Sequence, residues 1–114
     1  VTTRKKSDMR NVTTELSEED TFLLLNKVNK KYNTEIDDIL LVAVGFTIRE
    51  WKNIEKIAVN LEGHGREKIS DALDITRTVG WFTTRVPIIL EVNEADTIEH
   101  TIKSIKENMR NITN

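Results

Sequence analysis

Apolar residues recur at helical spacing in three segments of the chain, and each segment starts with a helix N-terminal signal. Ser17 and Asp20 form a Ser-x-x-Asp variant of the capping box, and the acidic residues 18–20 favour the positive end of the helix dipole. Similar signals occur at Thr34–Asp37, where Asp37 fits the N3 capping position, and at Asp96–Glu99. In the first segment the apolar residues at helical spacing are Phe22, Leu25, Val28 and Tyr32. The pattern predicts helices over residues 17–32, 35–51 and 97–110.

The second of these segments differs from the other two because its apolar residues lie on more than one face. A helix that is apolar nearly all round is buried on several sides. We therefore expect residues 35–51 to be the most buried element, with Leu40 packed in the core. The last segment has a single apolar stripe that includes Ile102 and Ile105, which is typical of an amphipathic helix on a protein surface.

Alternating or β-branched residues predict strands in the remaining segments. Residues 56–61 alternate between apolar and polar positions, as in a half-buried strand. Residues 79–92 are rich in β-branched and aromatic residues and predict a long strand, in which Pro87 implies an edge position or a bulge. Residues 9–16 alternate weakly and predict a short first strand. The expected fold is α/β, in the order β-α-α-β-β-α, with helices packed on a small incomplete sheet.

Composition and charge exclude several classes of protein. The 114 residues suffice for one domain, and 17 basic against 19 acidic residues give a net charge of -2, without the basic excess of a nucleic-acid binder. The longest apolar run, residues 39–44, is far shorter than the roughly 20 residues of a membrane span. The absence of cysteine excludes thiol nucleophiles, and no His or carboxylate cluster has metal-ligand spacing. We expect no nucleic-acid, membrane or metal binding.

The start at Val1 suggests a piece of a longer protein. Residues 1–8 are polar and basic and are expected to form a linker or tail, and residues 9–114 to form the domain proper.

The segment Glu62–Glu67, E-G-H-G-R-E, carries the most chemical information. A carboxylate, an imidazole and a guanidinium group follow the end of a predicted strand, and two glycines allow a sharp turn and close approach of a ligand. Loops at strand ends are frequent functional sites. Spacing alone leaves two interpretations open, a functional site or a polar turn with surface salt bridges.

Two further motifs favour the first interpretation. D-I-x-R-T-V-G-W-F-T-T-x-x-P lies at residues 74–87 and D-I-L-L-V-A at residues 38–43. With E-G-H-G-R-E between them, in the chain order 38–43, 62–67 and 74–87, these motifs resemble the epimerization domain of nonribosomal peptide synthetases. That domain is a branch of the condensation-domain superfamily. The resemblance extends over nearly the whole chain, although Val86 stands where the family usually has an aromatic residue. It implies part of a chloramphenicol-acetyltransferase-like lobe, the middle of the C-terminal lobe.

The resemblance implies that Glu62 is an acid/base catalyst that acts on the Cα–H of an aminoacyl or peptidyl thioester, inverting L to D. The second catalytic group of the family is a His in an H-H-x-x-x-D-G motif of the N-terminal lobe, and this chain has no such motif. We therefore expect the fragment alone to be inactive. Glu67 is the competing carboxylate, which is expected to face solvent or to pair with Arg66.

The candidate substrate-binding or loop-ordering residues are His64, Arg66 and Trp81. Arg66 is expected to fix the loop by pairing with Asp71 or Asp74. Of the two neighbouring aromatic residues, Trp81 and Phe82, one is expected in the core and the other at the tunnel between the two lobes.

The resemblance also implies partners and alternatives. The substrate is carried on the phosphopantetheine of a partner peptidyl carrier protein, no cofactor of its own is needed, and the location is cytoplasmic. The missing N-terminal lobe is a further partner, and open sheet edges predict weak self-association. Two rival functions stay open, a condensation domain that forms amide bonds and a non-catalytic docking module. The segment R-T-V-G-W-F-T argues against the first, because condensation domains more often have G-x-F-V-N-T there.

Overall fold

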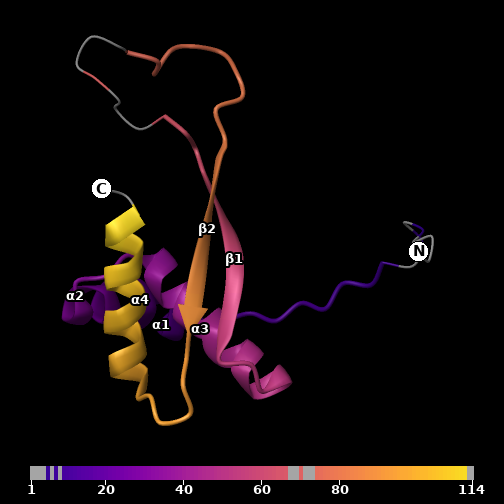
Figure 1. The fold of residues 1–114 in the computed structure, drawn as a ribbon, viewed down its shortest axis with the longest axis vertical. Coiled ribbons are helices and arrows are strands. Elements are labelled where there is room, and N and C mark those ends of the chain that lie inside the picture. Colours follow the sequence, from indigo (N-terminus) through magenta and orange to yellow (C-terminus); the bar gives the residue numbers. More distant parts are fainter. Residues whose placement is uncertain (1–4, 6, 8, 67–69, 71–73, 113–114) are drawn as a thin grey trace.

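The computed structural model describes residues 5, 7, 9–66, 70 and 74–112. A broken N-terminal helix is followed by a long helix, a β-hairpin and a final helix (Figure 1). The elements are α1 (Glu18–Leu23), the π-helical stretch η2 (Leu24–Val28), α2 (Asn29–Tyr32), α3 (Ile36–Lys52), β1 (Lys56–Gly63), β2 (Thr84–Glu91) and α4 (Ile98–Ile112). The predicted α/β class is confirmed. Within the described part of the chain, no helix is long and apolar enough to cross a membrane.

The predicted first strand is wrong. Residues 9–16 form no strand, are exposed, and run away from the rest of the chain in Figure 1. A strand is stable only when it pairs with a neighbour and buries one face. The described sheet consists of β1 and β2 alone, so the weak alternation of residues 9–16 has no partner strand there.

The first helix begins where the sequence predicts. Ser17 Oγ accepts a hydrogen bond from the Asp20 backbone N–H at 3.0 Å, and α1, η2 and α2 continue to Tyr32. Its apolar stripe is only partly covered, because Phe22 is 57% exposed whereas Tyr32 packs against the core. Two basic side chains of α4 donate to carbonyls at the C-terminal end of this helix: Lys106 Nζ to Tyr32 O at 3.3 Å and Arg110 Nη2 to Asn33 O at 3.0 Å.

Helix α3 is capped one residue later than predicted. The N-cap residue is Glu35, and the N3 residue is Asp38, not Asp37; Asp38 Oδ2 accepts from the Glu35 backbone N–H at 2.9 Å. The buried apolar side chains are Leu41 and Val42, at 8% and 5% exposure, whereas Leu40 is 51% exposed. The expectation that Leu40 is packed in the core is therefore wrong, since the face of α3 that meets the other elements is the one that carries Leu41.

The two strands form an antiparallel hairpin whose faces differ. The register runs from Lys56 opposite Glu91 to Gly63 opposite Thr84. One face packs on the helices, and its residues are Ile57, Val59, Leu61, Val86, Ile88 and Leu90. The other face is left uncovered within the described residues and carries Lys56, Ala58, Asn60, Glu62, Arg85, Pro87, Ile89 and Glu91. Glu62 therefore lies on the open face of the sheet.

The second strand is shorter than predicted. It begins at Thr84 rather than at residue 79, because its partner strand ends at Gly63 and no other strand in the described residues lies beside residues 79–83. The edge position implied by Pro87 is confirmed, since β2 has β1 as its one neighbour in the described sheet.

Helix α4 closes the core. Ile102 and Ile105 of α4 pack with Leu41 of α3 and with Ile88 and Leu90 of β2. In the turn before α4, the Asn93 backbone N–H donates to Asp96 Oδ2 at 2.9 Å and holds the pKa of the Asp96 carboxyl below its usual value. The core is thus one layer between the inner face of the hairpin and helices α3 and α4.

Candidate active site

Glu62 and Arg85 form an ion pair at the loop end of the hairpin. They lie directly opposite each other in the strand register, so their side chains share the uncovered face. Arg85 Nε and Nη2 both contact Glu62 Oε1, at 2.8 and 2.7 Å. The Glu62 side chain is 56% exposed. The carboxylate that the sequence singles out is therefore accessible and held on one side.

The turn after Glu62 depends on Gly65. Its φ is +62°, in the left-handed region, and a Cβ there would lie 1.6 Å from the Phe82 carbonyl oxygen. His64 Nδ1 accepts a hydrogen bond from the Arg66 backbone N–H at 2.9 Å. Gly65 thus lets the chain pass close to the backbone of Phe82, and the His64 imidazole helps to order the backbone of the turn.

Arg66 ties this turn to the loop that leads into β2. Its Nη1 donates to Ile75 O at 2.7 Å and its Nη2 to Thr78 O at 2.9 Å. The guanidinium carbon also lies 4.3 Å from the centre of the Phe82 ring. These contacts fasten the turn to the loop that follows it in the chain.

Of the two partners expected for Arg66, Asp74 is engaged elsewhere. Asp74 Oδ1 instead accepts from the Thr76 hydroxyl at 2.7 Å and from the Thr76 N–H at 2.9 Å. The hydroxyl first, and then the N–H, lower the pKa of the Asp74 carboxyl. The other expected partner, Asp71, and the competing carboxylate, Glu67, lie outside the described residues.

Trp81 and Phe82 lie away from the core between helices and sheet. Trp81 is 88% exposed, and Phe82 is half-buried below Arg66. The expectation that one of the two belongs to the core is wrong, because residues 79–83 continue past the end of β1. The structure nevertheless brings His64, Arg66 and Trp81 together around one open hollow of about 590 Å³, which is also lined by Val79, Gly80, Phe82 and Thr83.

Glu62 borders a different hollow, of about 190 Å³, between the end of β1 and the first half of α3. The apolar residues around it are Leu40, Leu41, Val44, Leu61 and Met109, and the second acidic one is Asp37. Sequence reasoning placed Leu40 in the core and overlooked Arg85. The only available signal for Arg85 was a cation on an expected edge strand, since the cross-strand partner depends on the register.

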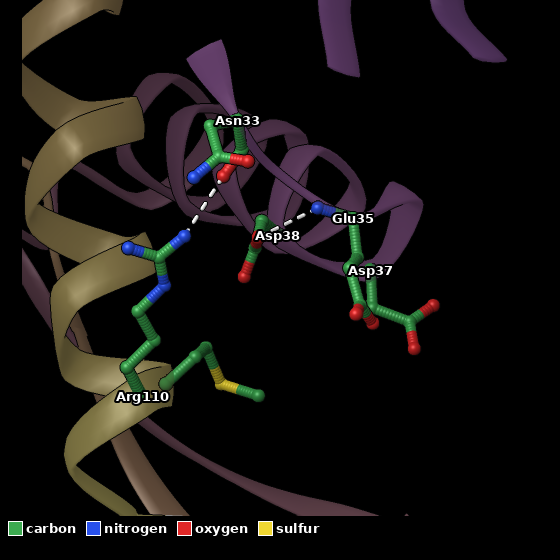
Figure 2. A pocket seen from close by; sticks show the side chains of 6 residues that line it. Asn33, Glu35, Asp37, Asp38 and Arg110 are labelled. Carbon is green, nitrogen blue, oxygen red and sulfur yellow. Dashed lines mark hydrogen bonds between the residues drawn. The ribbon is translucent and has the colours of Figure 1, made fainter. Parts of the chain in front are cut away.

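A third hollow, of about 220 Å³, lies where the start of α3 meets the end of α4 (Figure 2). Glu35 and Asp37 lie on the far side of Asp38 from Arg110, which donates to the carbonyl of Asn33 (Figure 2). Asp38 is engaged in capping α3. Among the described residues, no group of three or more His, Cys, Asp or Glu side chains is arranged to hold a metal ion.

Comparison with known proteins gives the same family throughout. The condensation-domain family matches residues 2–114. Gramicidin S synthase 1 of Brevibacillus brevis is 51% identical over 96% of this chain, and surfactin synthase subunit 2 of Bacillus subtilis (strain 168) is 50% identical over 92%. The epimerization domain from the third module of tyrocidine synthetase B, a crystal structure, superimposes with a TM-score of 0.77 at 41% identity over 85% of this chain.

The chain is much shorter than these proteins. It spans 10% of gramicidin S synthase 1, 3% of surfactin synthase subunit 2 and 22% of the epimerization-domain structure. The family match nevertheless covers nearly every residue, and the fold agrees with that of the epimerization domain. The chain therefore belongs to the condensation-domain family of the nonribosomal peptide synthetases.

Proposed function

We propose that this chain is part of an epimerization domain in which Glu62 moves the Cα proton of a carrier-bound aminoacyl or peptidyl thioester. The observation that carries the proposal is the position of Glu62: an accessible carboxylate at the end of β1, on the open face of the sheet and paired there with Arg85. The similarity to the epimerization domain of tyrocidine synthetase B supports it.

The proposed chemistry is an inversion at one carbon. Glu62 takes the proton from Cα, and the electron pair of the broken C–H bond moves into the thioester carbonyl to give an enolate. A second group then delivers a proton to the opposite face of Cα, and the enolate collapses back to the thioester. Glu62 loses its proton to solvent, and the second group regains one from solvent. No oxidation or reduction occurs, so the step itself requires no redox cofactor.

The second group and the substrate carrier come from outside this chain. We assign the opposite proton donor to a histidine of the N-terminal lobe, and the thioester to the phosphopantetheine arm of a peptidyl carrier protein. The residues His64, Arg66 and Trp81 follow Glu62 in the sequence and line an open hollow. On this proposal their side chains contact the substrate or order the loop. On this proposal the present chain alone is inactive, because one half of the proton-transfer pair is absent.

The test uses the complete domain and an aminoacyl thioester on its carrier protein. Glu62→Gln keeps the size of the side chain but removes the base, and a general base contributes about 10²- to 10⁴-fold to rate. Epimerization and deuterium uptake at Cα, followed by mass spectrometry, should fall together by this factor while the carrier thioester still binds. Glu91→Gln is the matched control, because Glu91 is a paired carboxylate at the other end of the same sheet face.

Two outcomes would contradict the proposal. Normal exchange in Glu62→Gln, with exchange abolished in Glu67→Gln, would move the catalytic role to the other carboxylate of the motif. Amide-bond formation with an acceptor thioester, without deuterium uptake at Cα, would assign the domain to condensation instead.

A further inference from the structure

We propose that Arg85 is a positioning residue for Glu62. This inference rests on the proposed function, since it assigns a role toward the carboxylate that is proposed to move the proton. The strand register places Arg85 directly opposite Glu62, and both side chains emerge on the uncovered face of the hairpin. The register of the two strands therefore places the two side chains next to each other.

The geometry of the pair is asymmetric. Arg85 Nε donates to Glu62 Oε1 at 2.8 Å, and Arg85 Nη2 lies 2.7 Å from the same oxygen. A guanidinium group is a rigid planar donor, and a charge-assisted hydrogen bond from it limits the orientations that the carboxylate can take. Oε1 is thereby occupied, and Oε2 is the oxygen that accepts the Cα proton.

A role in folding stability explains this pair poorly. Arg85 and Glu62 side chains are 70% and 56% exposed, and ion pairs between exposed groups contribute little to stability. The same sheet face carries a comparable pair at its other end, where Lys56 Nζ contacts Glu91 Oε1 at 3.0 Å. That second pair lies six register positions away from Glu62 and provides an internal control.

The experiment measures kcat and KM for epimerization, and deuterium uptake at Cα, in the complete domain with a carrier-bound thioester. Arg85→Gln should lower kcat by about 10- to 100-fold, because a misplaced catalytic group costs up to about 10²-fold, and should leave KM within about twofold. Arg85→Lys, which keeps one charged donor, should retain an intermediate kcat. Lys56→Gln should leave both kcat and KM unchanged.

A double-mutant cycle separates this inference from the proposed function. If Arg85 acts through Glu62, Arg85→Gln should lower kcat in the wild-type background but not in the Glu62→Gln background. The melting temperatures of all variants are compared, so that a loss of kcat with an unchanged melting temperature is assigned to positioning and not to unfolding.

Three results would overturn the inference. Normal kcat in Arg85→Gln, with exchange abolished in Glu62→Gln, would refute the role of Arg85 and leave the proposed function intact. Equal loss from Arg85→Gln in both backgrounds would mean that Arg85 acts independently of Glu62. Full exchange in Glu62→Gln would refute the proposed function, and the positioning role with it.

Discussion

Gly65 is the residue where local backbone geometry and the candidate site depend most directly on each other. Its positive φ, and the closeness of the Phe82 carbonyl to where a Cβ would lie, leave no room for a side chain. The turn that it allows brings Arg66 to the carbonyls of Ile75 and Thr78. Gly65 has no side chain of its own, but the turn that it allows determines where the functional side chains of the motif lie.

We predict that Gly65→Ala opens this turn. A non-glycine residue in the left-handed region costs roughly 1–2 kcal/mol, and the contact with Phe82 requires the loop to move. The free energy of unfolding should fall by at least about 1 kcal/mol, and limited proteolysis between residues 64 and 83 should become faster. Gly63→Ala is the matched control, because among the described glycines only Gly65 has a positive φ. Equal proteolysis rates in the two variants would contradict the prediction.

At the scale of the element, helix α3 shows how packing selects one face of an apolar helix. Leu40 and Leu41 are adjacent and chemically identical, yet they are 51% and 8% exposed. Successive helical residues point about 100° apart, so only one of the two can face α4 and the hairpin. Leu40 instead borders the hollow beside Glu62.

We predict unequal costs for truncating these two leucines. Leu41→Ala should lower the free energy of unfolding by about 2–5 kcal/mol, because it leaves a cavity in the core. Leu40→Ala should cost less than about 1 kcal/mol, as exposed positions usually do. Urea denaturation of the two variants measures the difference, and equal losses would refute the burial of α3 described above.

At the scale of the whole molecule, the described sheet is open at both strand edges and on one face. The described sheet has two strands, so each strand leaves a row of N–H and C=O groups without a partner strand, and one sheet face is uncovered. Unpaired edges favour association with other chains. The chain spans 22% of the epimerization-domain structure that it matches, which is consistent with a fold that other parts of such a domain complete.

We predict weak self-association of the 114-residue chain. Sedimentation velocity at increasing concentration should show species larger than the monomer in the high micromolar range. The complete domain is the control, because we expect its remaining strands to cover these edges and to keep it from associating through them. A strictly monomeric chain over the whole range would contradict the prediction.

The local signals in the sequence determined where most elements lie. Ser17 begins the first helix because its hydroxyl bonds within one turn, and β1 follows from the alternation of Ile57, Val59 and Leu61. The motif around Glu62 could also be recognised in the sequence, because its glycines and charged residues are consecutive. Signals of this kind act between residues a few positions apart, so they need no knowledge of the rest of the fold.

Long-range pairing was decided by the tertiary structure. The Glu62–Arg85 pair spans 23 residues and exists because the hairpin register places the two residues opposite each other. Residues 9–16 resemble a strand but have no partner strand in the part of the chain that the structure describes. Leu41 rather than Leu40 is buried because of where α4 and β2 lie. A single strand or helix cannot specify which of its faces is covered, since burial is a property of the pair of surfaces that meet.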